Sequence, residues 1–142
     1  MSAMETFLPH CGDSMSPWLR SGDQCIVSFD EQKAHIGDII LVRLDDEWVT
    51  HRVIDRRGEA VIVKGDRNFA SDTISQKHFG IVIGHVRHGK EMRWKNRATF
   101  LQRYCATISR LSLSPWAKNR ITRQVLLGLS NAVYRCFRLF YC

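Results

Sequence analysis

Between residues 12 and 88, short runs rich in Val and Ile alternate with pairs of turn-forming residues. The spacing, roughly ten residues from one run to the next, is typical of antiparallel strands that close into a small barrel or sandwich. We therefore expect a mainly β fold. The predicted strands are Cys25–Phe29, Asp38–Leu44, Trp48–Ile54, Ala60–Lys64 and Gly80–Val86. The turn-forming pairs are Gly22-Asp23, Gly37-Asp38, Asp45-Asp46, Arg57-Gly58 and Gly65-Asp66.

The predicted strand Trp48–Ile54 carries a histidine between two valines. Because side chains alternate along a strand, Val49, His51 and Val53 should share one face. The imidazole of His51 should therefore lie with apolar neighbours.

The pattern changes near Ala98, where helical spacing replaces the short runs. We expect helices at Ala98–Leu113 and Trp116–Tyr141, separated by Ser114-Pro115, since proline is well placed to open a helix. In the second helix, apolar residues recur at intervals of three or four: Ile121, Val125, Leu129, Val133, Phe137 and Phe140. Such a stripe is most often packed in a core.

Charge divides the chain in a similar place. Residues 1–86 hold 9 Lys and Arg against 13 Asp and Glu, whereas residues 87–142 hold 12 Lys and Arg against the single acid Glu91. A block of this kind indicates a part that meets something anionic. We therefore expect a β domain over residues 1–90 and a basic, amphipathic helical tail over 91–142.

The five cysteines are odd in number and lack the spacing of a metal site. We expect free thiols, no metal and no cofactor. Before Arg20 there is neither a basic residue nor the long apolar run of a secretory signal. The apolar segment Val125–Cys142 is interrupted by Asn131, Arg135 and Arg138, so we expect no membrane span. These features together predict a cytoplasmic protein.

Three residue types in the β region could form a nucleophilic site. Ser14 lies in a turn-forming segment, Gly12-Asp13-Ser14-Met15-Ser16-Pro17, where a hydroxyl is exposed and a backbone N–H is free for an oxyanion. His51 could remove the serine proton, and an Asp could orient the imidazole. Asp66 and Asp72 are both candidates. Each residue also has a structural explanation, such as turn chemistry at Asp66 or a helix N-cap at Asp72.

These segments, in this order, resemble the conserved boxes of the signal peptidase I family. That family belongs to the superfamily that also holds the self-cleaving SOS-response repressors. Its serine box resembles Ser14-Met15-Ser16-Pro17-Trp18-Leu19-Arg20-Ser21-Gly22-Asp23. The endoplasmic-reticulum and archaeal branch has a histidine box similar to His51-Arg52-Val53. It also has an acidic box similar to Lys64-Gly65-Asp66-Arg67-Asn68, with a second acid at Asp72. The likeness covers about residues 9–86.

The resemblance implies a mostly β endopeptidase that cleaves after small residues of a leader-like segment bound in extended form. It implies Ser14 as nucleophile and His51 as base, with Asp72 or Asp66 as orienting acid. The backbone at Ser14 and Met15 would bind the oxyanion. The chain departs from the family in two ways: 13 residues precede Ser14 where a membrane helix is usual, and Gly12 stands where many members have a second serine donor.

Two other functions fit the same residues. One is a regulator that cleaves itself or a partner, as the repressor branch does. The other is a binding module without catalysis. For the basic tail, the alternatives to core packing are a peripheral position on an anionic membrane face, contact with a partner protein and, less favoured because no binding motif accompanies the charge, nucleic acid.

Overall fold

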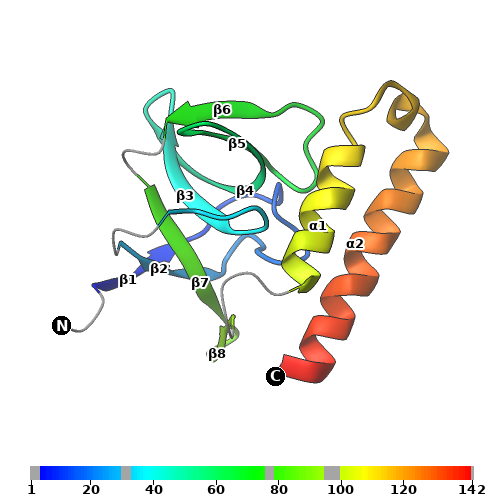
Figure 1. Ribbon diagram of the computed structural model, residues 1–142. Coiled ribbons are helices and arrows are strands. Elements are labelled where there is room, and N and C mark those ends of the chain that lie inside the picture. The colour runs from blue at the N-terminus through cyan, green and yellow to red at the C-terminus, as the bar shows by residue number, and fades with distance from the viewer. Residues whose placement is uncertain (1–3, 30–32, 76–78, 95–99, 142) are drawn as a thin grey trace.

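The β region forms one antiparallel sheet that curls on itself (Figure 1). The structure is a computed structural model that describes residues 4–29, 33–75, 79–94 and 100–141. The sheet order is β1-β2-β7-β3-β4-β5-β6, with β8 paired to β7. The strands are β1 (Glu5–Pro9), β2 (Gln24–Ser28), β3 (Ile39–Leu44), β4 (Glu47–Arg57), β5 (Ala60–Lys64), β6 (Asp72–Ser75), β7 (Phe79–Arg87) and β8 (Lys90–Arg93). The expectation of a mainly β fold is confirmed.

The five predicted strands are all present, although β4 runs further than expected. Three strands were not predicted: β1, β6 and β8. The alternative interpretation of Asp72 as a helix N-cap is wrong, because Asp72 begins β6 and pairs with Val63 of β5. The rest of the expected helical turn, residues 76–78, lies outside the described residues.

Two helices follow the sheet, α1 (Phe100–Leu111) and α2 (Arg120–Tyr141), with the short 3-10 helix η1 (Pro115–Lys118) between them. Both correspond to predicted helices, although the expected start at Ala98 lies outside the described residues. The helices run side by side, and α1 lies between the sheet and α2 (Figure 1). In the described part of the chain, no helix is long and apolar enough to cross a membrane.

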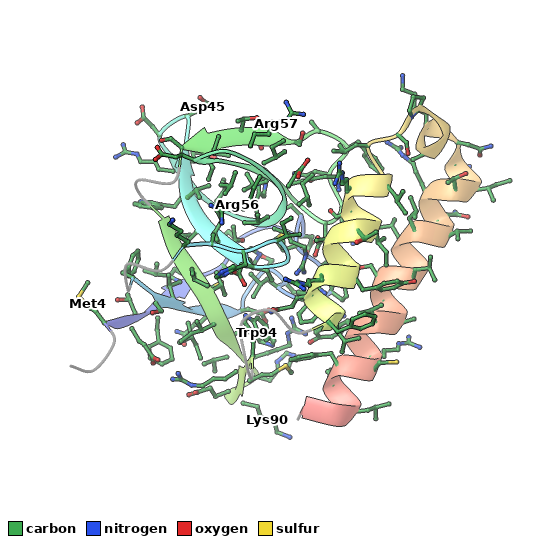
Figure 2. The ribbon with its side chains drawn as sticks, viewed as in Figure 1. Met4, Asp45, Arg56, Arg57, Lys90 and Trp94 are labelled. Carbon is green, nitrogen blue, oxygen red and sulfur yellow. The ribbon has the colours of Figure 1, made fainter. Side chains whose placement is uncertain are left out.

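An aromatic cluster joins the helices to the sheet region, and side chains fill the space between them (Figure 2). Trp18 is fully buried at its centre. Its ring centroid lies 5.5 Å from that of Trp94, 5.4 Å from Tyr134 and 4.9 Å from Phe137. Aromatic pairs at these separations attract beyond their buried area. The segment that carries Ser14 is thus packed against α2, and the two expected parts of the chain share one core.

The apolar stripe of α2 is divided between two environments. Val133 and Phe137 are buried in the shared core, whereas Ile121, Val125 and Leu129 are 70%, 56% and 40% exposed. The stripe leaves the core for a geometric reason. Apolar residues four apart are spaced by more than the 3.6 residues of a helical turn, so the stripe that they form winds around the helix. The first half of the stripe therefore faces away from the core that receives the second half.

Truncating Phe137 should destabilise the whole protein. Phe137→Ala removes a fully buried ring from the cluster around Trp18, and such a change costs about 3–5 kcal/mol in unfolding free energy. Leu139→Ala is the matched control, because Leu139 is 80% exposed on the same helix and its loss should stay within about 0.5 kcal/mol. Urea unfolding followed by tryptophan fluorescence measures both. Equal stability of the two variants would contradict the shared core.

Candidate active site

Ser14 lies in a turn whose neighbours are anchored in the core. Met15, Trp18 and Leu19 are fully buried, while Ser14 itself is only partly covered. The turn is closed by hydrogen bonds from the Ser16 N–H to the Asp13 carbonyl (3.0 Å) and from the Leu19 N–H to the Met15 carbonyl (3.2 Å). The apolar residues of the serine box thus fix the backbone, which leaves the Ser14 hydroxyl at the surface of a groove.

The turn is also tied to the loop after β5. The Arg67 N–H donates to the Ser14 carbonyl at 2.8 Å, and the Asn68 N–H donates to the Gly65 carbonyl at 2.9 Å. A Cβ at Gly65 would lie 2.9 Å from the Ser14 Cβ and 2.7 Å from the Asn68 side-chain nitrogen. Any side chain at position 65 would push Ser14 away. The glycine of this box is therefore required for close approach and not only for a turn.

Ser14 and His51 line the same groove. The groove has a volume of about 630 Å³ and is walled mostly by apolar residues of β1, β2, β3 and β4, with the 60% exposed Trp48 among its lining residues. The expectation that His51 lies with apolar neighbours agrees with the core cluster that contains Val53, against which Val49 packs. The apolar lining residues include Leu8, Pro9, Cys25, Phe29, Leu41 and Val49.

Asp72 is the acid that faces His51. Its Oδ2 lies 3.4 Å from the His51 Nδ1, and Nδ1 has no hydrogen-bond partner among the described residues. The pair is thus longer than an ordinary N–H···O hydrogen bond and is not aligned as one. Asp72 sits on β6 and its side chain is 46% exposed, whereas the imidazole is buried.

Burial lowers the pKa of His51 below its usual value. The carboxylates of Asp72 and Asp66 act in the opposite direction, because a nearby negative charge favours the imidazolium, and the Lys64 ammonium adds to the lowering. The net effect keeps the imidazole neutral at pH 7. A neutral imidazole is the form that can accept a proton.

Asp66 is engaged elsewhere. Its carboxylate forms a bidentate ion pair with the Arg52 guanidinium. Nε donates to Oδ1 at 2.8 Å and Nη2 donates to Oδ2 at 2.7 Å. Arg52 is fully buried, donates from Nη1 to the Gly37 carbonyl at 2.8 Å, and stacks 5.2 Å from the Trp18 ring. Of the two candidate acids, the structure brings Asp72 to His51 and Asp66 to Arg52.

Two other basic side chains were not singled out from the sequence. Lys64 is fully buried, and its ammonium donates to the Gly65 carbonyl and to the Ser109 hydroxyl of α1, both at 3.0 Å. Burial lowers the pKa of Lys64 to about 8. Lys64 pairs in register with Arg52, the neighbour of His51, so strand alternation directs it to the opposite face of the sheet from His51. The rule that buried lysines need partners could have flagged it.

His10 is the second of these residues. It is buried in the wall of the same groove, and its Nδ1 lies 3.2 Å from the Thr50 hydroxyl. Its Nε2 is buried and has no hydrogen-bond partner in the described part of the chain. Burial lowers the pKa of His10, so it too is neutral at pH 7. His10 directly follows β1, a strand that the sequence did not predict, and β1 positions it beside the groove.

The groups expected to hold an oxyanion are the backbone N–H groups at Ser14 and Met15. Within the described residues, neither donates a backbone hydrogen bond of the turn. Gly12 adopts φ of +90°, and a Cβ there would meet nothing within 4 Å. The space beside Gly12 is therefore open. No cluster of three or more His, Cys, Asp or Glu side chains that could hold a metal ion occurs among the described residues.

The described residues thus combine a curled β domain with a groove lined by a serine and a buried histidine, and an acid lies beside the histidine. Residues 6–87, more than half of the chain, match the family described as Peptidase S24-like. The chain belongs to this family. Searches of curated proteins and of solved structures found no match.

Replacing Asp66 should destabilise the protein far more than replacing Asp72. Asp66→Asn leaves the buried Arg52 guanidinium without its counter-charge, which costs about 3–5 kcal/mol of unfolding free energy. Asp72→Asn changes a half-exposed residue, so its effect should stay within about 0.5 kcal/mol. Thermal and urea unfolding measure both variants. A larger loss for Asp72→Asn would show that the two acids have been assigned the wrong way round.

Proposed function

We propose that the protein is a serine endopeptidase in which Ser14 is the nucleophile, His51 the general base and Asp72 the acid that orients the imidazole. The observation that carries the proposal is the shared groove: Ser14 and His51 line it together, and the Asp72 carboxylate lies 3.4 Å from the His51 Nδ1. Asp66 is paired with Arg52, so Asp72 is the acid that is left to orient His51.

In this mechanism, the Ser14 hydroxyl attacks the scissile carbonyl while His51 takes its proton through Nε2. Nδ1–H points to Asp72, which fixes the tautomer and stabilises the imidazolium that forms. The backbone N–H groups at Ser14 and Met15 stabilise the negative charge on the carbonyl oxygen. His51 then gives its proton to the leaving amine. Water attacks the acyl-enzyme in the second half of the reaction with His51 again as base.

The substrate is a polypeptide bound in extended form. β1 ends the strand order of the described sheet, so its outer edge is available to an added strand, and Leu8 and Pro9 of β1 line the groove. Main-chain hydrogen bonds to such an edge would give affinity, and apolar side chains would fill the groove. We propose a leader- or signal-like segment of a precursor as the substrate, in keeping with the resemblance of the serine, histidine and acidic boxes. A cytoplasmic site of action stays a prediction from the sequence.

A regulator that cleaves itself or a partner is the second candidate function, since it needs the same serine and base and belongs to the same superfamily. Self-cleavage would divide the purified chain into two fragments, and Ser14→Ala would prevent it. Failure to cleave any peptide in trans, together with such fragments, favours this candidate over precursor processing.

A fluorophosphonate probe should label Ser14 of the unmodified protein, because labelling requires an activated hydroxyl. Ser14→Ala should abolish the labelling. His51→Ala should slow it by about 10²-fold or more, and Asp72→Asn should slow it as well, since the imidazole loses its orienting carboxylate. Mass spectrometry of the labelled peptide locates the adduct.

Ser16→Ala is the matched control, because Ser16 lies in the same turn two residues away and should leave the labelling rate unchanged. If folded wild-type protein takes up no probe, the chain is a binding module without catalysis. Equal labelling of the wild-type and His51→Ala proteins would remove His51 from the mechanism.

The pH dependence of labelling should report His51. Because burial lowers the pKa of the imidazole, the rate should rise with pH through an apparent pKa below 6.5 and be level near pH 7. Asp72→Asn should move this rise in the labelling rate to lower pH, since the Asp72 carboxylate favours the imidazolium. If Lys64, with a pKa of about 8, were the base, the labelling rate would rise only above neutral pH. That result would exclude His51 as the base.

A further inference from the structure

The helix α2 presents a second apolar face that no described part of the chain covers. One face packs into the core through Leu126, Val133, Tyr134 and Phe137. On the other, four large apolar residues are well exposed: Ile121 (70%), Val125 (56%), Leu129 (40%) and Leu139 (80%). The exposed residues Gly128, Ala132 and Cys136 lie between them at helical spacing. Together these seven residues form a continuous stripe along the helix, which we call the outer face of α2.

The charge beside this stripe is entirely positive. Arg120, Arg135 and Arg138 of α2 are exposed, and α2 contains no acidic residue. Arg123 is less available, because its guanidinium lies 3.3 Å from the centre of the Phe69 ring. Across residues 87–142 the basic residues outnumber the acidic ones by 12 to 1. An occupant of the outer face must therefore accept apolar side chains and supply negative charge.

This charge pattern disfavours a second copy of the chain. Two outer faces packed together by two-fold symmetry would bring like patches into contact, and neither helix has an acidic residue to pair with the arginines of the other. Like charges held close together in an interface oppose association. The apolar stripe alone would allow such a dimer, but its basic border does not favour it.

We propose that the outer face of α2 binds the surface of an anionic lipid bilayer. A helix that lies in the interface places apolar side chains among the acyl chains and basic side chains at the headgroups. Val125, Leu129 and Leu139 supply the first set, and Arg135 and Arg138 the second. Anionic lipid attracts each basic residue near its surface, and the attraction weakens with salt.

Binding in this way would leave the groove accessible. In Figure 1, α2 lies at the opposite side of the molecule from β1 and β2, which line the groove. The side chains that enter the lipid are exposed and make no part of the core around Trp18. The attachment thus needs no rearrangement of the fold. It is also independent of the peptidase chemistry proposed above.

Vesicle co-sedimentation with the full chain tests the proposal. The protein should sediment with vesicles of phosphatidylcholine containing 30% phosphatidylglycerol at low salt, and bind vesicles of pure phosphatidylcholine at least tenfold more weakly. Raising the salt should reduce the binding to the anionic vesicles. Equal binding to both compositions, or none to either, would overturn the proposal.

Two pairs of variants locate the surface. Val125→Glu with Leu129→Glu should weaken binding to anionic vesicles at least tenfold, whereas Met4→Glu with Phe7→Glu should not, although Met4 and Phe7 are similarly exposed (68% and 50%). Met4 lies on the far side of the molecule from α2 (Figure 2). Arg135→Gln with Arg138→Gln should also weaken binding, and Arg20→Gln with Arg57→Gln, which removes the same charge elsewhere, should have a smaller effect.

Two further measurements keep the outcome unambiguous. All these substitutions are at exposed positions, so thermal unfolding should show intact folding. The α2 variants should also leave fluorophosphonate labelling of Ser14 in solution unchanged. Light scattering determines the oligomeric state. A wild-type dimer that Val125→Glu with Leu129→Glu converts to a monomer, without binding to vesicles, would assign the outer face to a second copy and overturn the proposal.

Discussion

The buried ion pair between Arg52 and Asp66 is the interaction on which the groove depends. Arg52 is the neighbour of His51 on β4, and Asp66 lies in the loop whose Arg67 N–H holds the Ser14 carbonyl. The pair therefore connects the strand of the proposed base to the turn of the proposed nucleophile. A guanidinium buried without a counter-charge would be strongly unfavourable, so arrangements that separate the two elements are excluded. The two-pronged geometry also fixes their orientation.

The helical part of the chain supports the same loop from the other side. Lys64 begins the loop, and its ammonium is held between the Gly65 carbonyl and the hydroxyl of Ser109 in α1. The family match ends at residue 87, so Ser109 lies outside it. The inner face of α1 thus helps to hold the loop after β5. The outer face of α2 takes no part in this contact and is the surface for which lipid binding is proposed above.

The sequence predicted those parts of the fold in which burial leaves a clear pattern. The strands rich in Val and Ile were found because they are buried, while β6 and β8 are short and mostly polar or half-exposed and carry no such signal. β1 is half-exposed with alternating burial at the edge of the sheet. The choice between Asp66 and Asp72 could not be made either. It depends on which acid the buried Arg52 captures, and that is a property of strand register rather than of spacing.

Strand register also separates the two buried bases of the site. His51 and Lys64 both lose proton affinity through burial, but they lie on opposite faces of adjacent strands. At pH 7 a lysine with a pKa of about 8 is still mostly protonated, and the Lys64 ammonium already donates to two oxygens at 3.0 Å. It has no lone pair to offer Ser14. Its charge instead lowers the pKa of His51. Lys64 therefore helps to keep the imidazole of His51, the proposed base, neutral.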